Sequence, residues 1–223
     1  MINVLMSRSG ALIEDYAFKH LKDVLKPNMN VLVIGFSFFG ILDEKSYFDM
    51  YDSNSEYYLK IQNNFKFYGI DNVNWLYYYN QSKEEMINLI KNADVIYFPG
   101  GAPDLMMERI IEKDILKPLK EFNKIVIGSS AGAMIQLKHY HISPDQEYFK
   151  FSEHEGLGYI DDFFIEVHYA KRKKQKKAMR RMRKTYLKEV YTIPDDGMLI
   201  VNNNEIKVLN SARKFYNRRG INK

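Results

Sequence analysis

Residues 124–133 read Lys-Ile-Val-Ile-Gly-Ser-Ser-Ala-Gly-Ala. An apolar run ends here in Gly128-Ser129-Ser130-Ala131-Gly132, which fits the pattern G-x-S-x-G with Ser130 at its centre. That pattern is typical of a nucleophile elbow, a sharp turn from a buried strand into a helix that lifts a serine hydroxyl out of the backbone. Flanking glycines leave room for such a turn because they have no Cβ. The alternative is a tight turn whose small residues serve packing alone.

Apolar strand-like runs alternate with helix-like segments outward from this turn. Strands are predicted over 2–6, 31–34, 73–79, 94–98 and 124–127, and helices over 11–25, 45–68, from Ser82, and over 103–122 with an interruption near Pro118. Repeated strand–helix units with continuous apolar strands indicate a mainly parallel sheet covered by helices on both faces. Ligand sites in such sheets lie at the carboxyl ends of the strands, so Gly100-Gly101 and the Ser130 turn are expected at one edge.

The last third of the chain has a different pattern. Residues 163–167 predict a strand, a basic run at 171–184 predicts a helix, and 198–201 with 206–209 predict a β-hairpin that turns through Asn202-Asn203-Asn204. No internal repeat or linker-like stretch divides the sequence. We therefore expect a single α/β domain over residues 1–223.

Composition excludes several classes of site. Cysteine is absent from the 223 residues, which rules out disulfides, thiolate zinc sites and a cysteine nucleophile. The first residues lack the pattern of a signal peptide, and no apolar stretch approaches the roughly 20 residues of a membrane span. A cytoplasmic protein without membrane association is expected. The aromatic content of 14% leaves room for a homodimer interface.

The basic run at 171–184 contains ten Lys or Arg residues and no acid, although the net charge of the chain is only +5. The simplest interpretation is a solvated helix whose buried stripe consists of Met179, Met182 and Tyr186. The run could also steer acidic substrates toward a nearby site. Nucleic-acid binding is the least favoured of the three interpretations.

A serine nucleophile needs a general base, and histidine is the usual one because it titrates near neutrality. His168 ends the apolar strand at 163–167 and would be presented at a sheet edge, although a purely structural histidine is the alternative. The other four histidines fit other roles: His20 a helix surface, His139 and His141 a loop or helix end, and His154 a solvated segment.

The acid that would orient the histidine is not fixed by sequence order. Asp195 and Asp196 lie at a turn, Asp145 lies in a loop beyond the elbow helix, and Asp161 and Asp162 precede the strand that leads to His168. The Ala131 N–H is a candidate oxyanion donor, and Gly100-Gly101 offers a second donor from another strand end. The alternative for the glycine pair is a simple turn into the helix that Pro103 begins.

Together these blocks resemble peptidase family S51, which contains aspartyl dipeptidases (peptidase E) and cyanophycinases. The resemblance rests on Val95-Ile96-Tyr97-Phe98-Pro99-Gly100-Gly101, on Gly128-Ser129-Ser130-Ala131-Gly132-Ala133, on Phe164-Ile165-Glu166-Val167-His168-Tyr169, and on Ile193-Pro194-Asp195-Asp196-Gly197. It covers roughly residues 2–209. One departure is Ala102-Pro103-Asp104 after the glycine pair, where peptidase E-like sequences usually have Asn.

The resemblance implies a flavodoxin-like three-layer sandwich of the class I glutamine amidotransferase type, and it implies roles for individual residues. Ser130 would be the nucleophile, His168 the base, and Gly101 with Ala131 the oxyanion hole. Asp196 is preferred as the acid, with Asp145 second. Gly100 and Arg172 are candidates for substrate binding.

The resulting hypothesis is a serine peptidase, of dipeptidase or exopeptidase type, that acts on small or N-terminal peptides without a metal or cofactor. The alternative is a non-catalytic member of the same fold that binds a ligand or partner, in which the basic 171–184 helix could take part.

Overall fold

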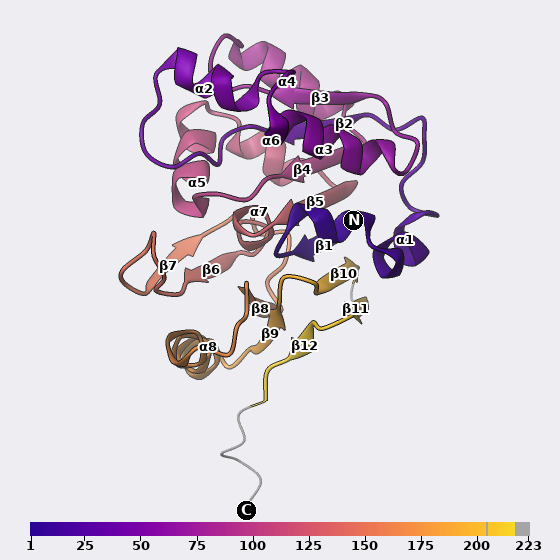
Figure 1. The fold of residues 1–223 in the computed structure, drawn as a ribbon. Helices are drawn as coiled ribbons and strands as arrows, with labels where there is room; N and C mark the ends of the chain where they lie inside the picture. Colours follow the sequence, from indigo (N-terminus) through magenta and orange to yellow (C-terminus); the bar gives the residue numbers. More distant parts are fainter. Residues whose placement is uncertain (204, 217–223) are drawn as a thin grey trace, which may run out of the picture.

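The computed structural model describes residues 1–203 and 205–216, and its main feature is a seven-stranded sheet (Figure 1). In order across the sheet, the strands are β11 (Glu205–Leu209), β10 (Met198–Asn202), β1 (Ile2–Met6), β5 (Ile125–Ser129), β4 (Val95–Phe98), β2 (Val31–Ile34) and β3 (Val73–Leu76). The five strands from β1 to β3 are parallel, whereas β10 and β11 pair antiparallel. The predicted parallel sheet and C-terminal hairpin are confirmed, although Asn204 of the hairpin turn lies outside the described residues.

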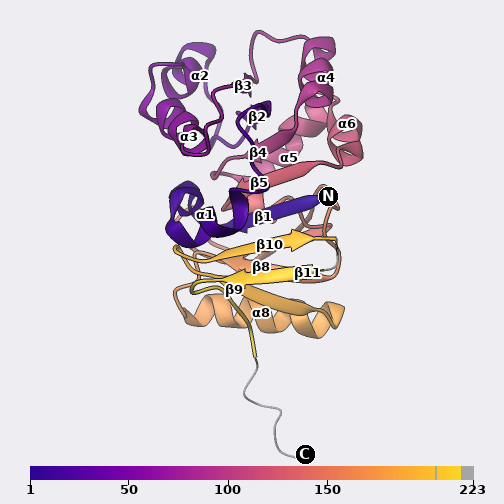
Figure 2. The same ribbon diagram turned by 90° about the vertical axis from the view of Figure 1, so that its right-hand side faces the viewer.

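Helices cover both faces of this sheet, as Figure 2 shows edge-on. One face packs against the 3-10 helix η1 (Ser9–Ile13), α1 (Asp15–Leu21), α2 (Glu44–Tyr51) and α3 (Glu56–Lys66). The other face packs against α4 (Lys83–Asn92), α5 (Pro103–Glu112), α6 (Leu116–Glu121) and α7 (Ala131–Met134). Each face has its own cluster of fully buried side chains because the strands are apolar on both sides.

Two of the predicted helices are divided in the structure. The helix expected over 45–68 breaks between α2 and α3, because Asp52 forms a turn and Ser55 caps α3 by accepting a hydrogen bond from the Tyr58 N–H. The helix expected over 103–122 breaks at residues 113–115 and not near Pro118. Pro118 lies in the first turn of α6, where its missing N–H leaves no helical hydrogen bond unmade. The capping box of Ser82 and Glu85 is present at α4.

Two smaller sheets accompany the main sheet: in Figure 1 the sheet of β8, β9 and β12 lies below it, and the β6–β7 sheet lies at the left. β8 (Phe163–Val167) has the predicted bounds and pairs parallel with β9 (Glu189–Ile193), while β12 (Arg213–Lys214) pairs with the other side of β9. β6 (His139–Ile142) and β7 (Ser152–Glu155) form a hairpin that the sequence analysis does not anticipate. β8 and β9 end beside the carboxyl edge of the main sheet, and this contact positions the candidate site.

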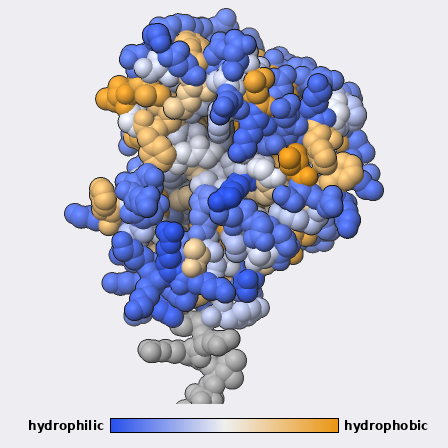
Figure 3. All heavy atoms as spheres, in the orientation of Figure 1, coloured by the Kyte–Doolittle hydropathy of each residue, from blue (hydrophilic) through white to orange (hydrophobic). Residues whose placement is uncertain are grey.

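The basic run forms α8 (Lys173–Tyr186), which packs on β8 and β9. Its buried face contains Met179 and Met182, and Tyr186 packs partly buried beside them, so the predicted stripe is confirmed. Its basic side chains face outward, and the lower left of the surface in Figure 3, over α8, is strongly hydrophilic. None of the helices in the described part of the chain is long and apolar enough to cross a bilayer.

Candidate active site

The turn at Ser130 has the strained backbone of a nucleophile elbow. β5 ends at Ser129 and α7 begins at Ala131. Between them Ser130 has φ 48° and ψ −110°, a conformation that residues with a Cβ rarely adopt. Gly132 permits the close approach of helix and strand, since a Cβ there would lie 1.9 Å from the Phe98 carbonyl oxygen. The strand, strained turn and helix predicted from residues 124–133 are therefore present.

Two backbone N–H groups near Ser130 donate no hydrogen bond to another described residue: those of Ala131, the first residue of α7, and Gly101, in the turn after β4. Gly101 lines the same cavity as Ser130. It has φ +143°, and a Cβ on it would lie 1.9 Å from the Ser37 carbonyl oxygen. The turn therefore requires glycine at this position. Gly100 is held through its carbonyl oxygen, which accepts a hydrogen bond from Ser37 Oγ at 2.8 Å.

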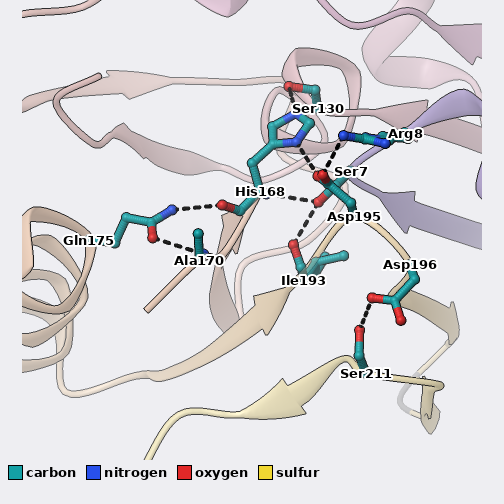
Figure 4. Close-up of polar contacts among 10 residues, drawn as sticks. All are labelled: Ser7, Arg8, Ser130, His168, Ala170, Gln175, Ile193, Asp195, Asp196 and Ser211. Atoms are coloured by element: carbon teal, nitrogen blue, oxygen red, sulfur yellow. Dashed lines mark hydrogen bonds and ion pairs between the residues drawn. The ribbon is translucent and has the colours of Figure 1, made fainter. Parts of the chain in front are cut away.

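Ser130, His168 and Asp195 form a hydrogen-bonded chain, shown in Figure 4. The Ser130 hydroxyl lies 3.0 Å from Nε2 of His168, and Nδ1 of the same ring lies 2.6 Å from Asp195 Oδ1. With the imidazole proton assigned to Nδ1, the serine donates to Nε2 and the ring donates to the carboxylate. The side chains of His168 and Asp195 are 47% and 42% exposed, so solvent and ligands reach this chain of groups.

Asp196 does not lie beside His168, which corrects the preference drawn from the sequence. Its carboxylate accepts a hydrogen bond from Ser211 Oγ (Figure 4) and another, at 3.3 Å, from Asn210 Nδ2. Adjacent residues at the turn after β9 face opposite ways, so only Asp195 contacts the imidazole.

Two of the remaining acids, Asp145 and Asp161, have other partners. Asp145 lies in the loop after β6, and its Oδ1 accepts hydrogen bonds from the N–H groups of Glu147 and Tyr148. Asp145 thus shapes a turn at the rim of the cavity and makes no hydrogen bond to His168. Asp161 pairs with Lys138 and Lys188, whose side chains hold the pKa of this carboxyl below its usual value.

Two buried polar side chains hold the backbone of His168, which has φ 49°. Ser7, just after β1, accepts a hydrogen bond from the His168 N–H at 2.9 Å and donates to the Ile193 carbonyl oxygen at 2.6 Å. On the other side of the same residue, Gln175 Nε2 donates to the His168 carbonyl oxygen at 3.0 Å (Figure 4). Gln175 Oε1 accepts from the Ala170 N–H, which closes the loop between β8 and α8. The sequence analysis identifies neither Ser7 nor Gln175.

Arg8, the residue after Ser7, contacts the acid of the same arrangement. Its guanidinium lies 2.6 Å from Asp195 Oδ2, on the oxygen that His168 does not use. The Arg8 side chain is 65% exposed, so the ion pair is screened by solvent. Two consecutive residues just after β1 therefore hold the candidate base and acid: Ser7 contacts His168, and Arg8 contacts Asp195.

The other histidines have structural surroundings. His20 is exposed on α1, as predicted. His139 and His141 lie in strand β6 and His154 lies partly buried in β7, so the loop and solvent positions predicted for them are wrong. His141 is fully enclosed, and its Nε2 lies 2.8 Å from Glu166 Oε2.

A buried arginine fixes the loop that borders the glycine turn. Arg109 on α5 is 7% exposed and donates to the carbonyl oxygens of Phe36, Phe38 and Gly40. Its guanidinium also lies 3.3 Å from the centre of the Phe38 ring. This loop carries Ser37, against which Gly101 packs, so Arg109 supports one wall of the site from a distance.

Ser130 and His168 open into a cavity of about 290 Å³. Its floor and sides come from the elbow, from the end of β8 and from the loop after β6, and Arg172 at the beginning of α8 also lines it. Arg172 is exposed, and it is the sole Lys or Arg among the described residues that line this cavity. The predicted Arg172 therefore lies within reach of a ligand bound at Ser130.

The model of peptidase family S51 matches residues 49–209. The chain belongs to this family. No curated protein is significantly similar to the chain in sequence. Ser130, His168 and Asp195 all lie within the S51 match, whereas Ser7 and Arg8 precede it.

Solved structures with a similar fold include two proteins described as peptidases. One is a candidate peptidase E protein from Listeria monocytogenes EGD-e, with 18% identity, a TM-score of 0.67, and coverage of 93% of this chain and 97% of that one. The other is a peptidase from an acI-B1 Actinobacterium, with 15% identity, a TM-score of 0.58, and coverage of 96% and 93%. At these identities the likeness supports the fold alone.

Proposed function

We propose that the protein is a serine peptidase that hydrolyses an amide bond of a short peptide at Ser130. The observation that carries the proposal is the continuous hydrogen bonding from the Ser130 hydroxyl through His168 to Asp195, at a strained and accessible turn. Membership of family S51 supports the same chemistry.

The first half of the reaction follows from the positions of these atoms. As Ser130 Oγ attacks the peptide carbonyl carbon, its proton passes to His168 Nε2, 3.0 Å away. Asp195 holds the ring in the orientation that makes Nε2 the acceptor and stabilises the positive imidazolium. The carbonyl oxygen becomes negative, and the N–H groups of Ala131 and Gly101 are the donors that would stabilise it.

The second half restores the serine. The tetrahedral adduct collapses as its C–N bond breaks, and the imidazolium gives its proton to the departing amine. Water then attacks the acyl ester with His168 again taking a proton, and the carboxylic acid leaves as the Ser130 hydroxyl re-forms. Each proton that leaves Oγ or water returns to the amine or to Oγ, so no metal or cofactor is needed for balance.

The cavity favours small substrates. A volume of about 290 Å³ suits a dipeptide or the end of a longer peptide rather than a folded segment. Arg172 at the rim would pair with a substrate carboxylate.

We also propose that the chain forms a single domain over residues 1–223. We assign its fold to the flavodoxin-like, class I glutamine amidotransferase-like type.

Labelling with a fluorophosphonate tests the proposal, because this probe reacts with activated serines. Wild-type protein should be labelled at one residue, Ser130, and Ser130→Ala should abolish the label. Ser129→Ala is the matched control, since the Ser129 hydroxyl is buried and bonded to Tyr97 at 2.9 Å. Labelling that persists in Ser130→Ala would exclude Ser130 as the nucleophile. Absence of label from folded wild type would favour the non-catalytic binding protein instead.

A further inference from the structure

Glu166 is a buried carboxylate in the cavity for which the proposed reaction has no use. It lies in β8, two residues before His168, and its side chain is 5% exposed. Acidic side chains are rarely buried so completely without a charged partner. The contacts of its two carboxylate oxygens therefore indicate its role.

One oxygen of Glu166 is fixed by two donors. Oε2 accepts hydrogen bonds from His141 Nε2 at 2.8 Å and from Ser143 Oγ at 2.9 Å. His141 Nδ1 is enclosed and has no partner among the described residues, so the ring proton belongs on Nε2, facing the carboxylate. The pair from β6 holds the carboxylate in one orientation without neutralising it through a Lys or Arg.

The second oxygen is available to a ligand. Oε1 makes no hydrogen bond to the described residues, and it is not among the fully enclosed polar atoms that lack a partner. Since Glu166 lines the same cavity as Ser130 and His168, Oε1 is open to that cavity. A carboxylate oxygen that is largely removed from water gains most from a ligand that supplies both charge and N–H donors.

The charge of the cavity lining favours a cation. Asp145, Glu147 and Glu166 line it together with a single guanidinium, that of Arg172 at the exposed rim. The basic helix α8 presents most of its charge elsewhere, on the outer surface. At the buried end of the cavity, the Glu166 carboxylate would repel an acidic substrate group and attract a protonated amine.

We propose that Glu166 binds a protonated amine of the substrate, and that His141 and Ser143 orient it for this purpose. This inference rests on the proposed function, because it assigns a substrate class to the same site. The amine comes from one of two sources: the N-terminus of the peptide or the side chain of a lysine. Both would place an ammonium group, with its three donors, on Oε1.

Binding measured without turnover tests this proposal. In the Ser130→Ala protein, calorimetry with four dipeptides separates the sources: lysyl-alanine and norleucyl-alanine, each with its N-terminus either unmodified or acetylated. Acetyl-norleucyl-alanine has no ammonium and should bind weakest. At least one ammonium-bearing dipeptide should bind about 10-fold or more tightly, in line with a charge-assisted hydrogen bond. If norleucyl-alanine shows the tighter binding, the amine is the N-terminus of the peptide; if acetyl-lysyl-alanine shows it, the amine is the lysine side chain.

Variants of Glu166 then connect the preference to this residue. Glu166→Gln, added to Ser130→Ala, should remove the preference for ammonium, whereas Glu166→Asp should retain part of it. Glu147→Gln removes one solvent-screened charge from the exposed rim, so it should weaken the ammonium preference by less than about 3-fold, which is less than the loss in Glu166→Gln. Thermal unfolding of each variant checks that it is folded.

Three results would overturn the proposal. The first is equal binding of all four dipeptides by the Ser130→Ala protein, and the second is an ammonium preference that survives Glu166→Gln. The third is a loss of ammonium preference in Glu147→Gln as large as that in Glu166→Gln, which would indicate attraction by the overall negative charge of the cavity instead of a direct contact. The first comparison does not depend on any Glu166 variant folding. Because these measurements need no reaction at Ser130, the subsite and the hydrolase proposal succeed or fail separately.

Discussion

Ser7 Oγ accepts a hydrogen bond from the His168 N–H at 2.9 Å, although 161 residues separate the two in the chain. The same hydroxyl donates to the Ile193 carbonyl oxygen, two residues before Asp195. One buried hydroxyl at the end of β1 thus joins the segment that carries the candidate base to the segment that carries the candidate acid. The orientation of the imidazole depends on a residue that never touches it.

Ser7→Ala should leave the His168 N–H and the Ile193 carbonyl oxygen unpaired. The free energy of unfolding should fall by about 1–3 kcal/mol, and fluorophosphonate labelling of Ser130 should slow by about 10-fold. Ser7→Thr keeps the hydroxyl and should restore part of the rate. Ser211→Ala is the control, because Ser211 bonds Asp196 and should not affect labelling. A destabilised Ser7→Ala protein that labels at the wild-type rate would limit Ser7 to a structural role.

The two adjacent acids after β9 should differ sharply when each is changed to Asn. Asp195→Asn should slow peptide hydrolysis or labelling by about 10²-fold or more, because the imidazole loses the carboxylate that fixes its tautomer. Asp196→Asn should change the rate by less than about 3-fold, since its partners are Asn210 and Ser211. The rates of the two variants are to be measured side by side. A larger loss in Asp196→Asn than in Asp195→Asn would assign the acid role to Asp196, as the sequence suggested.

Gly101→Ala should disable the glycine turn. The added Cβ would lie 1.9 Å from the Ser37 carbonyl oxygen, and φ is +143°, so the turn must move and its N–H with it. Labelling should slow by about 10²-fold. Gly158→Ala is a matched control, since Gly158 has φ +82° but no atom within 4 Å of the added Cβ. It should lose about 1 kcal/mol of stability and label normally. Equal labelling of the two variants would exclude Gly101 from the oxyanion hole.

Arg109→Met should loosen the loop at residues 36–40. Three carbonyl oxygens would lose their buried donor, and the free energy of unfolding should fall by about 2–4 kcal/mol in urea titrations. Labelling should also slow, since this loop supports Gly101. Arg109→Lys keeps the charge but not the planar fork, and it should give an intermediate result. Unchanged stability in Arg109→Met would show that solvent replaces the guanidinium without cost.

The protein should lose stability in alkali. Burial is the main cause that raises the pKa of Tyr77 and of Tyr78 to about 12, from an ordinary value of 10.0. Below pH 10 these groups are neutral in both states. As the pH rises from 10 towards 12, the unfolded chain ionises first, so the free energy of unfolding falls. Urea titrations across this range should show the decline, and Tyr78→Phe should make it shallower. A flat or rising stability would contradict the assigned environments.

The sequence predicts the parts of the site that have local patterns. The turn at Ser130 follows from the pentapeptide at 128–132 and the strand before it from the apolar run that precedes it. The end of β8 likewise follows from the apolar run before His168. The order of parallel strands brings Gly101 to the same edge without further information. These predictions succeed because chain direction and burial fix which end of a strand reaches the site.

Other parts of the site depend on tertiary contacts that leave no local pattern. Asp195 and Asp196 are equivalent in sequence, and the choice between them depends on which way the turn after β9 faces. Ser7 could have been suspected only from β1 pairing directly with β5. Glu166 stands alone in an apolar strand, and its importance depends on a hairpin, β6–β7, that the sequence analysis does not predict.

Ser130, with its positive φ at the elbow, lacks its hydrogen-bond partners in an incomplete polypeptide. Its imidazole partner, His168, comes 38 residues later, and the carboxylate follows after a further 27. Ser7, which holds the His168 backbone, lies 161 residues before His168. Under the proposed mechanism, translation must therefore pass residue 195 before any copy gains a reactive hydroxyl. Copies truncated before residue 195 would lack the proposed acid and stay unreactive toward a fluorophosphonate.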